Sequence, residues 1–203
     1  MQNVVIRAIE RLDFRTKEAY KTLRTNLSFA GKNVKVISLT SCTPNEGKTS
    51  VSFQLCLSLA ESGKQTILVD ADLRKSVLRG RYKANREKYG LSHYLSGQVE
   101  LDDACCRTNV NNFDIIFAGP VPPNPSELLG GDAFRNMLEV LRMKYDYVIV
   151  DTPPLGSVID AAIVGAICDG TVIVVESGAI SYKFVQNVKE QLNKVGCRIL
   201  GCV

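Results

Sequence analysis

The sequence predicts an α/β fold in which a mostly parallel sheet lies between two layers of helices, a three-layer α/β/α sandwich. Short β-rich runs alternate with helical patterns along the 203 residues, as they do in βαβ units. The strand cores are apolar at consecutive positions, as in Val148-Ile149-Val150, which indicates that helices cover both sheet faces. Polar residues follow several of these strands directly, at the edge where open α/β folds bind ligands.

The elements follow in order along the chain. We expect strands over 34–40, 66–70, 113–118, 147–151, 171–176 and 198–203. A helix over 16–30, within an N-terminal helical segment 1–33, belongs to no βαβ unit and is free to contact another molecule. Helical patterns also run over 51–62 and 126–144. The prolines of 119–125 exclude helix and central strand there, and Ser126 is the expected N-cap of the helix that follows. Without a visible repeat or linker, residues 1–203 are expected to form one domain.

The composition is that of an ordinary globular protein, with 45% hydrophobic and 23% charged residues. No apolar run approaches the roughly 20 residues that cross a bilayer, and the charged N-terminus lacks a cleavable signal, so we expect a cytoplasmic protein. The seven cysteines form no C-x-x-C pair and are expected to be mostly buried, reduced thiols. His93 is the only histidine, which excludes histidine-rich zinc sites and argues against a Ser-His-Asp hydrolase. We expect His93 itself to be structural.

The net charge of +4 is unevenly distributed. Residues 1–35 carry eight basic and three acidic side chains, and residues 74–88 carry seven and one, so the remainder is acidic. Nucleic acid is one candidate partner for such patches. Solvated helix faces and subunit contacts explain them equally well, and no nucleic acid is expected as a partner.

A phosphate-binding loop follows the first expected strand. The run Ser41-Cys-Thr-Pro-Asn-Glu-Gly47-Lys48-Thr49-Ser50 leads into a helix, so that loop amides and the helix N-terminus can concentrate positive charge on a phosphate. Lys48 would reach the β- and γ-phosphates of a nucleotide, and the Thr49 hydroxyl would ligate Mg²⁺. Cys42 stands where the P-loop pattern has its first glycine. The candidate nucleotide-binding residues are Thr43, Pro44, Asn45, Glu46, Gly47, Lys48, Thr49 and Ser50.

Carboxylates follow two further strands. Asp70 ends the second strand and Asp72 lies two residues later, so the two side chains share a face in an extended segment. Asp151 ends an apolar strand, as in a Walker B element. A helix N-cap or a turn is the structural alternative for each aspartate alone. Together with the P-loop, these aspartates predict a P-loop NTPase fold that binds a nucleotide with Mg²⁺.

With these three motifs, the chain resembles the bacterial tyrosine kinases of the capsule and exopolysaccharide family, over about residues 16–203. Asp70-Ala-Asp72-Leu-Arg74 is similar to that family's second Walker element, and the Pro-Pro-Asn-Pro-Ser-Glu-Leu-Leu run within 119–129 is similar to one of its loops. Glu18-x-x-Lys21-x-x-Arg24 resembles its Glu-x-x-Arg-x-x-Arg self-association motif, except that Lys21 replaces an arginine and cannot form a bidentate carboxylate fork. Asn45 replaces a usual glycine, and asparagine tolerates left-handed backbone well.

The resemblance implies a cytoplasmic protein-tyrosine kinase that uses ATP and Mg²⁺ to phosphorylate tyrosine-bearing proteins, chiefly neighbouring copies of itself in a homo-oligomer. It also implies a transmembrane activator, the polysaccharide co-polymerase, which would hold the kinase at the inner face of the membrane where it regulates polysaccharide synthesis and export. The absence of H-R-D and D-F-G runs agrees with a P-loop kinase.

Phosphoryl transfer needs positioning and charge neutralisation, which gives the candidate residues their roles. Lys48 would hold phosphates, and Thr49 with Asp70 or Asp151 would hold Mg²⁺ directly or through water. We favour Asp70 as the group that faces the acceptor hydroxyl, with Asp72 supporting the metal, and the reverse assignment stays open.

Two other functions compete with the kinase. A partitioning or cell-division ATPase of the ParA and MinD type uses nucleotide to dimerise on DNA or membrane, but those proteins carry an extra lysine near the start of the P-loop. No lysine lies between Ser41 and Gly47 here. The third candidate is an inactive nucleotide-binding scaffold.

The resemblance also implies that the phosphate acceptors form a tyrosine cluster in a flexible tail. This sequence stops within the apolar run 198–203 and looks truncated. We therefore expect the chain to phosphorylate itself weakly. Tyr82 and Tyr89, in the basic stretch 74–89, are the best acceptors present.

Overall fold

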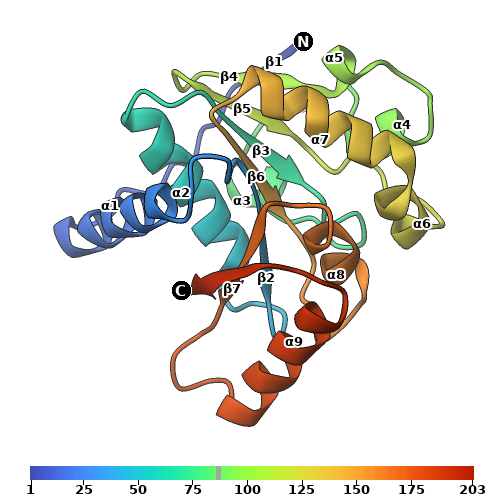
Figure 1. Ribbon diagram of the computed structural model, residues 1–203. Helices are drawn as coiled ribbons and strands as arrows, with labels where there is room; N and C mark the ends of the chain where they lie inside the picture. The colour runs from blue at the N-terminus through green and yellow to red at the C-terminus, as the bar shows by residue number, and fades with distance from the viewer. Residues whose placement is uncertain (86–87) are drawn as a thin grey trace.

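The computed structural model of the chain describes residues 1–85 and 88–203 (Figure 1). Arg86 and Glu87, which belong to the basic segment 74–88, lie outside the described residues. The strands are β1 (Gln2–Val4), β2 (Val36–Ser41), β3 (Thr66–Asp70), β4 (Cys106–Thr108), β5 (Phe113–Ile116), β6 (Tyr147–Asp151), β7 (Gly170–Val174) and β8 (Ile199–Cys202). The helices are α1 (Phe14–Phe29), α2 (Lys48–Glu61), α3 (Leu78–Arg81), α4 (Leu91–Leu95), α5 (Leu101–Ala104), α6 (Pro125–Gly130), α7 (Asp132–Lys144), α8 (Asp160–Gly165) and α9 (Tyr182–Lys194).

The strands of the described residues form one sheet in the order β1-β4-β5-β3-β6-β2-β7-β8. Every neighbouring pair is parallel except β4 with β5. The central strands β5, β3, β6, β2 and β7 therefore end at a common edge. The P-loop follows β2, and the expected carboxylates lie at the ends of β3 and β6, so the topology gathers the three motifs of the sequence.

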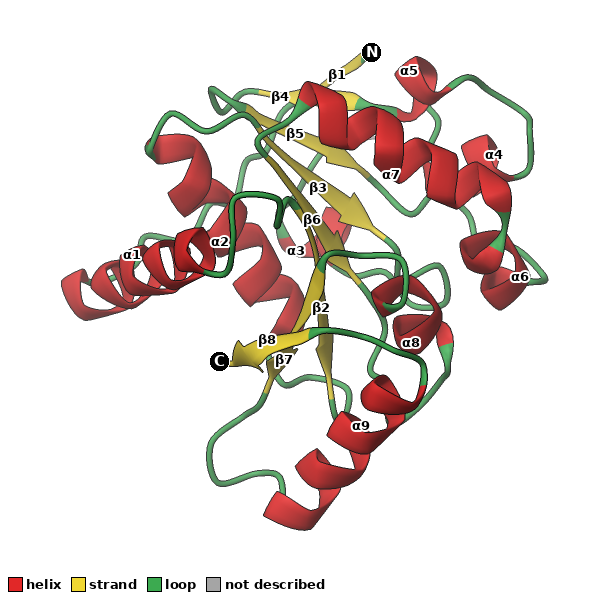
Figure 2. Ribbon diagram, in the orientation of Figure 1, coloured by secondary structure: helices red, strands yellow, loops and turns green. Residues whose placement is uncertain are grey.

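Helices cover both faces of the sheet, which confirms the predicted three-layer sandwich (Figures 1 and 2). On one face, Leu27 of α1, Phe53 of α2 and Leu78 of α3 pack against alternate residues of the strands. On the other face, α4 to α8 bury a separate apolar cluster, to which α7 contributes Phe134 and Leu138. Because the strands are buried on both sides, their apolar residues need no alternation.

The prediction of a wholly helical segment over 1–33 is wrong. Gln2–Val4 forms β1, which pairs parallel to β4 at the end of the sheet, and helix α1 begins only at Phe14. Strand β4 was also not predicted. Both strands have three residues, which is too short for a period of two to be visible. The Asp13 carboxylate accepts a hydrogen bond from the Thr16 amide at 2.7 Å, which fixes the start of α1.

The helix expected over 126–144 is two helices. Gly131 interrupts the pattern with extended backbone, ending α6 and capping α7. The expected N-cap is also wrong: Asn124 occupies that position, Pro125 takes the first helical position, and Ser126 lies inside the first turn. Its hydroxyl is used elsewhere, as described below.

Five of the seven cysteines are buried, as expected, while Cys168 is half-buried and Cys202 exposed; all are free thiols. His93 Nδ1 accepts a hydrogen bond from the Gly90 amide at 3.2 Å, at the start of α4. None of the described helices combines the length and the apolarity that a membrane-spanning segment requires.

Candidate active site

The P-loop joins β2 to α2 and turns through two residues with positive φ. Gly47 has φ 84° and Asn45 has φ 71°, a left-handed backbone that glycine adopts freely and asparagine better than most residues. The structure thus confirms the expectation that Asn45 can replace a glycine here. Gly47 occupies the N-cap position of α2, so the helix begins at Lys48. The positive end of a helix of fourteen residues faces the loop.

Glu46 supports the loop from inside. Its carboxylate accepts hydrogen bonds from the Thr43 amide and, at 2.9 Å, from the Thr43 hydroxyl. Its second oxygen accepts from the Glu176 amide at 3.3 Å. Glu46 and Thr43 therefore contact each other and shape the loop, while Asn45 and Gly47 line the pocket.

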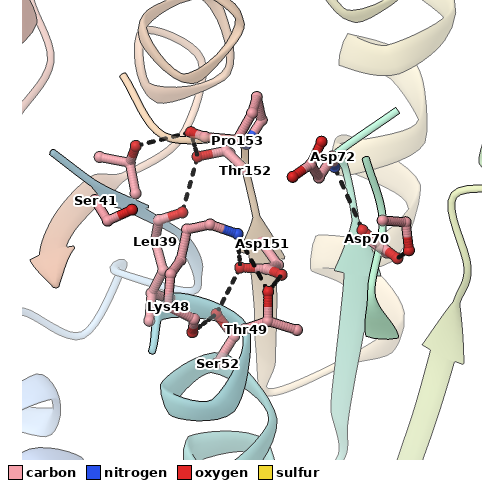
Figure 3. Close-up of polar contacts among 12 residues, drawn as sticks. Leu39, Ser41, Lys48, Thr49, Ser52, Asp70, Asp72, Asp151, Thr152 and Pro153 are labelled. Carbon is pink, nitrogen blue, oxygen red and sulfur yellow. Dashed lines mark hydrogen bonds and ion pairs between the residues drawn. The ribbon is translucent and has the colours of Figure 1, made fainter. Parts of the chain in front are cut away.

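Lys48, Thr49 and Asp151 meet in one buried cluster (Figure 3). The Lys48 Nζ lies 2.8 Å from Asp151 Oδ1, and the Thr49 hydroxyl donates to Asp151 Oδ2 at 2.7 Å. Ser52, one helical turn after Lys48, donates to Asp151 Oδ1 at 3.0 Å. All four side chains are buried, and buried charges are stable only with such partners. The cluster thus holds a cation, hydroxyls and a carboxylate in fixed positions at the strand ends.

Asp70 lies beside this cluster on the neighbouring strand, paired in register with Asp151. Burial, with the negative charge of Asp151 as the second cause, raises the pKa of Asp70 from 3.8 to about 7. The Ser76 hydroxyl, which donates to Asp70 Oδ2 at 2.5 Å, opposes this shift. Asp72 is half-buried and accepts from the Lys75 amide at 2.9 Å. Asp70 therefore exchanges its proton near neutral pH, as a general base requires.

A pocket of about 310 Å³ opens in front of the P-loop. Of the residues predicted to bind nucleotide, Pro44, Asn45, Gly47, Lys48 and Thr49 line it, together with Asp72. Thr43 and Glu46 support the loop from behind, and the Ser50 hydroxyl instead accepts a hydrogen bond from Arg81. The pocket joins the P-loop to the second carboxylate motif across the end of the sheet.

The residues at this pocket fit Mg²⁺. The Thr49 hydroxyl, which lines the pocket, and the buried carboxylates of Asp151 and Asp70 beside it would offer the oxygen ligands that Mg²⁺ prefers. The described residues contain no cluster of three or more His, Cys, Asp or Glu that could hold a metal alone. Mg²⁺ at nucleotide sites is held by one or two protein oxygens with phosphate oxygens and waters, so few protein ligands suffice.

Sequence reasoning did not identify the ion pair between the buried Asp160 and the exposed Arg74. The Arg74 guanidinium donates to both carboxylate oxygens of Asp160, at 2.7 and 3.1 Å, and Ser126 donates to Asp160 at 2.6 Å. Burial alone would raise the pKa of Asp160, but the hydrogen bonds from Arg74 and Ser126 outweigh it and hold that pKa below its usual range. An aspartate among the apolar residues of 158–164 was the available signal. The pair ties the Asp72 segment to α6 and α8.

The residues predicted for self-association lie on α1. Glu18 and Lys21 form an exposed ion pair at 2.7 Å, so both are accessible. Arg24 instead donates to the Ser58 carbonyl of α2, and Leu27 is buried in the core. The helix is thus packed on α2, not the free appendage that was expected, and Glu18 with Lys21 is the part of the motif that faces outward.

The two tyrosines predicted as acceptors differ in access. Tyr82 is 4% exposed and stacks on Phe53 with ring centroids 3.5 Å apart. Burial raises the pKa of Tyr82 far above its ordinary value. The prediction of Tyr82 as a phosphate acceptor is therefore wrong for the folded chain, because its ring fills the core. Tyr89 is half-buried and lines a cavity described below.

Comparisons with known proteins agree with this geometry. The AAA domain family matches residues 34–199. Tyrosine-protein kinase CpsD of Streptococcus agalactiae is 43% identical over 189 residues, covering 93% of this chain and 82% of the relative. The solved kinase domain of Escherichia coli tyrosine kinase ETK superimposes with a TM-score of 0.88 at 33% identity, covering 100% of this chain and 88% of that domain.

The cell division ATPase MinD of Pyrococcus furiosus is also similar, with a TM-score of 0.69 at 25% identity, covering 83% of this chain and 70% of MinD. It has the same kind of fold, at a lower similarity than the kinase domain. The three-layer P-loop fold is therefore common to both classes of protein that the sequence left in competition.

Proposed function

This chain belongs to the bacterial tyrosine kinase family, and from that premise we propose that it uses Mg²⁺ and ATP to phosphorylate tyrosines on other copies of itself and on other proteins. The chain is a protein-tyrosine kinase. One observation carries the proposal of how it acts: the buried cluster of Lys48, Thr49 and Asp151 lies beside Asp70, a carboxylate whose pKa is raised to about 7.

The P-loop and Lys48 bind the phosphates of ATP. Asn45, Gly47 and the start of α2 line the pocket, and the Lys48 ammonium, which contacts Asp151, would contact the β- and γ-phosphates of bound ATP. Thr49 and Asp151 would hold Mg²⁺, directly or through water, with Asp70 as a further candidate. When bound, Mg²⁺ neutralises the negative charge that develops on the phosphate oxygens.

Asp70 accepts the proton of the tyrosine. The phenol oxygen attacks the γ-phosphorus, the bond from that phosphorus to the β,γ-bridging oxygen breaks, and its electron pair leaves with ADP. The phenol proton passes to Asp70, whose pKa near 7 makes it a good acceptor at neutral pH. Asp72, which lines the pocket, is the alternative acceptor. Its support of the metal site is the role we favour for it.

We place this activity in the control of capsular or exopolysaccharide synthesis and export. The sequence resemblance supports this placement, as well as a homo-oligomer and a transmembrane activator of the co-polymerase type. Binding to such an activator would hold the kinase at the inner face of the membrane. The accessible pair of Glu18 and Lys21 on α1 is a surface on which neighbouring copies could meet.

Incubation with labelled ATP and Mg²⁺, followed by phosphoamino-acid analysis, tests the proposal. With a tyrosine-rich peptide added as acceptor, we expect phosphotyrosine on the peptide with the wild-type chain and none with Lys48→Met or Asp70→Asn. ATP hydrolysis without phosphotyrosine would instead favour a MinD-type ATPase switch. Binding of ATP without turnover would indicate an inactive scaffold.

A further inference from the structure

A second cavity, of about 740 Å³, opens at the ends of β3 and β5. Four basic side chains line it, those of Arg79, Arg81, Lys88 and His93, and none of its described lining residues is acidic. We call this cavity the basic groove. Three of its four basic residues come from the basic segment 74–88, whose partner the sequence left open.

The basic groove is continuous with the active site. Val77 and Arg81 line both this groove and the pocket in front of the P-loop. Ser76, another lining residue of the groove, donates its hydroxyl to Asp70 Oδ2 at 2.5 Å. Asp70 therefore lies between the groove and the cluster around Lys48. Asp70 itself is buried, so a ligand in the groove would reach the active site along Val77 and Arg81, which line both cavities.

The wall of the groove is rigid because two backbone segments touch. The amides of Leu91 and Ser92 donate to the carbonyls of Phe117 and Ala118, at 2.7 and 2.9 Å. A Cβ on Gly90 would lie 2.6 Å from the Gly119 amide nitrogen, so only glycine allows this approach. A preformed wall lowers the ordering cost of binding.

The charge of the groove selects an anionic ligand. Several cations around one concave surface raise the local concentration of negative groups. Apolar surface from Val77, Phe117 and Pro120 lies among them, which suits a peptide better than a free phosphate. The volume is within the range of about 300–1,000 Å³ that is typical of ligand pockets. A short extended segment therefore fits, with acidic side chains toward the cations.

We propose that the basic groove binds the acidic residues that flank the acceptor tyrosine, and so selects acidic tyrosine-bearing segments as substrates. This inference rests on the proposed function, because the groove matters for substrate specificity only if a tyrosine is phosphorylated in the site beside Asp70. Arg79 and Lys88 contact the acidic flanks, while the tyrosine ring passes Val77 to reach the γ-phosphate.

Two peptides and two charge-reversal variants test the inference. One peptide has a single tyrosine flanked by glutamates, and its match has glutamines in their place. The groove variant is Arg79→Glu with Lys88→Glu, both exposed residues outside the phosphate-binding machinery. The control variant is Arg135→Glu with Lys189→Glu, which makes the same charge change on exposed positions of α7 and α9.

We expect the groove variant to raise KM for the glutamate peptide by about tenfold or more, since two charge contacts are each reversed. KM for the glutamine peptide and KM for ATP should stay the same, and the control variant should match the wild type. In the wild type, added salt should raise KM for the glutamate peptide only. Unchanged melting temperatures would show that the variants fold.

Direct binding separates this inference from the proposed function. Fluorescence anisotropy of the labelled glutamate peptide should show binding to the wild type and control, with a loss in the groove variant. If no peptide is phosphorylated but this pattern holds, the groove assignment stands and the proposed function fails. Equal KM values and equal peptide affinity in groove variant and control would overturn the inference. So would a groove variant that loses only its affinity for single-stranded DNA.

Discussion

Replacement of Asp70 by asparagine removes one of two carboxylates that face each other across β3 and β6. Asp70 and Asp151 are paired in register, and each is 1% exposed. Asparagine has nearly the same shape, and its oxygen can still accept the hydrogen bond from Ser76. The substitution therefore changes charge while leaving packing almost intact, and we expect it to stabilise the fold.

The size of the effect follows from the raised pKa. Asp70 ionises above 3.8 in the unfolded chain but only near 7 in the folded chain. Between these pH values the folded chain keeps a proton that the unfolded chain has lost, so stability falls as pH rises. Each pKa unit corresponds to about 1.4 kcal/mol. The raised pKa of Asp70 thus costs the metal-free protein about 4 kcal/mol at pH 8, and clearly less at pH 5, where the folded chain keeps the proton.

Urea unfolding in EDTA measures this cost. Asp70→Asn should raise the free energy of unfolding by about 4 kcal/mol at pH 8, and by clearly less at pH 5. Asp160→Asn is the matched control, because Arg74 and Ser126 hold the pKa of this second buried aspartate below its usual range. That substitution should destabilise the fold at pH 8. Loss of stability in both variants would refute the reasoning and assign Asp70 a purely structural role.

Three other substitutions test separate parts of the molecule. Lys48→Met should abolish or severely weaken ATP binding in calorimetric titration, because the phosphates lose their cation; wild-type affinity would refute the P-loop assignment. Glu18→Ala with Lys21→Ala should lower the mass seen by light scattering, because this exposed pair is the part of the motif that faces outward, whereas an unchanged mass would exclude it from self-association. Gly90→Ala should cost about 1–3 kcal/mol in urea unfolding, because its Cβ would overlap the Gly119 backbone. A variant as stable as the wild type would show that this wall can move.

The sequence was sufficient for the central strands and for the P-loop. An apolar run such as 147–151 is buried on both faces when it forms a central strand of a sheet covered by helices, so it was predicted correctly. The P-loop was predicted from its own short motif. The pairing of Asp70 with Asp151 was only implied, because register depends on the whole sheet. The tertiary partners of Arg74 could not be predicted at all, since Asp160 and Ser126 are distant in sequence and carry no periodic signal.

The errors of prediction have physical causes. A strand of three residues such as β1 depends on pairing with β4, not on its own pattern. The split at Gly131 divides a helical pattern that is otherwise continuous, and a single glycine costs a helix only about 1 kcal/mol. Tyr82 looked accessible because its neighbours are basic, yet α3 turns its ring onto Phe53. Local charge does not reveal which side of a short helix is buried.

The sheet order also places side chains of opposite charge next to one another. The order β5-β3-β6-β2 brings the groove, Asp70, Asp151 and the P-loop together along one edge, so that negative side chains lie between two groups of cations. The positive charge of Lys48 stabilises the ionised form of Asp70 and so lowers the pKa of Asp70, against the larger effect of burial. An anionic nucleotide in front of the P-loop and an anionic peptide in the groove would therefore meet near the same buried carboxylate. Transfer of the phenol proton to Asp70 neutralises this carboxylate. The neutral side chain would then repel neither the nucleotide nor the peptide.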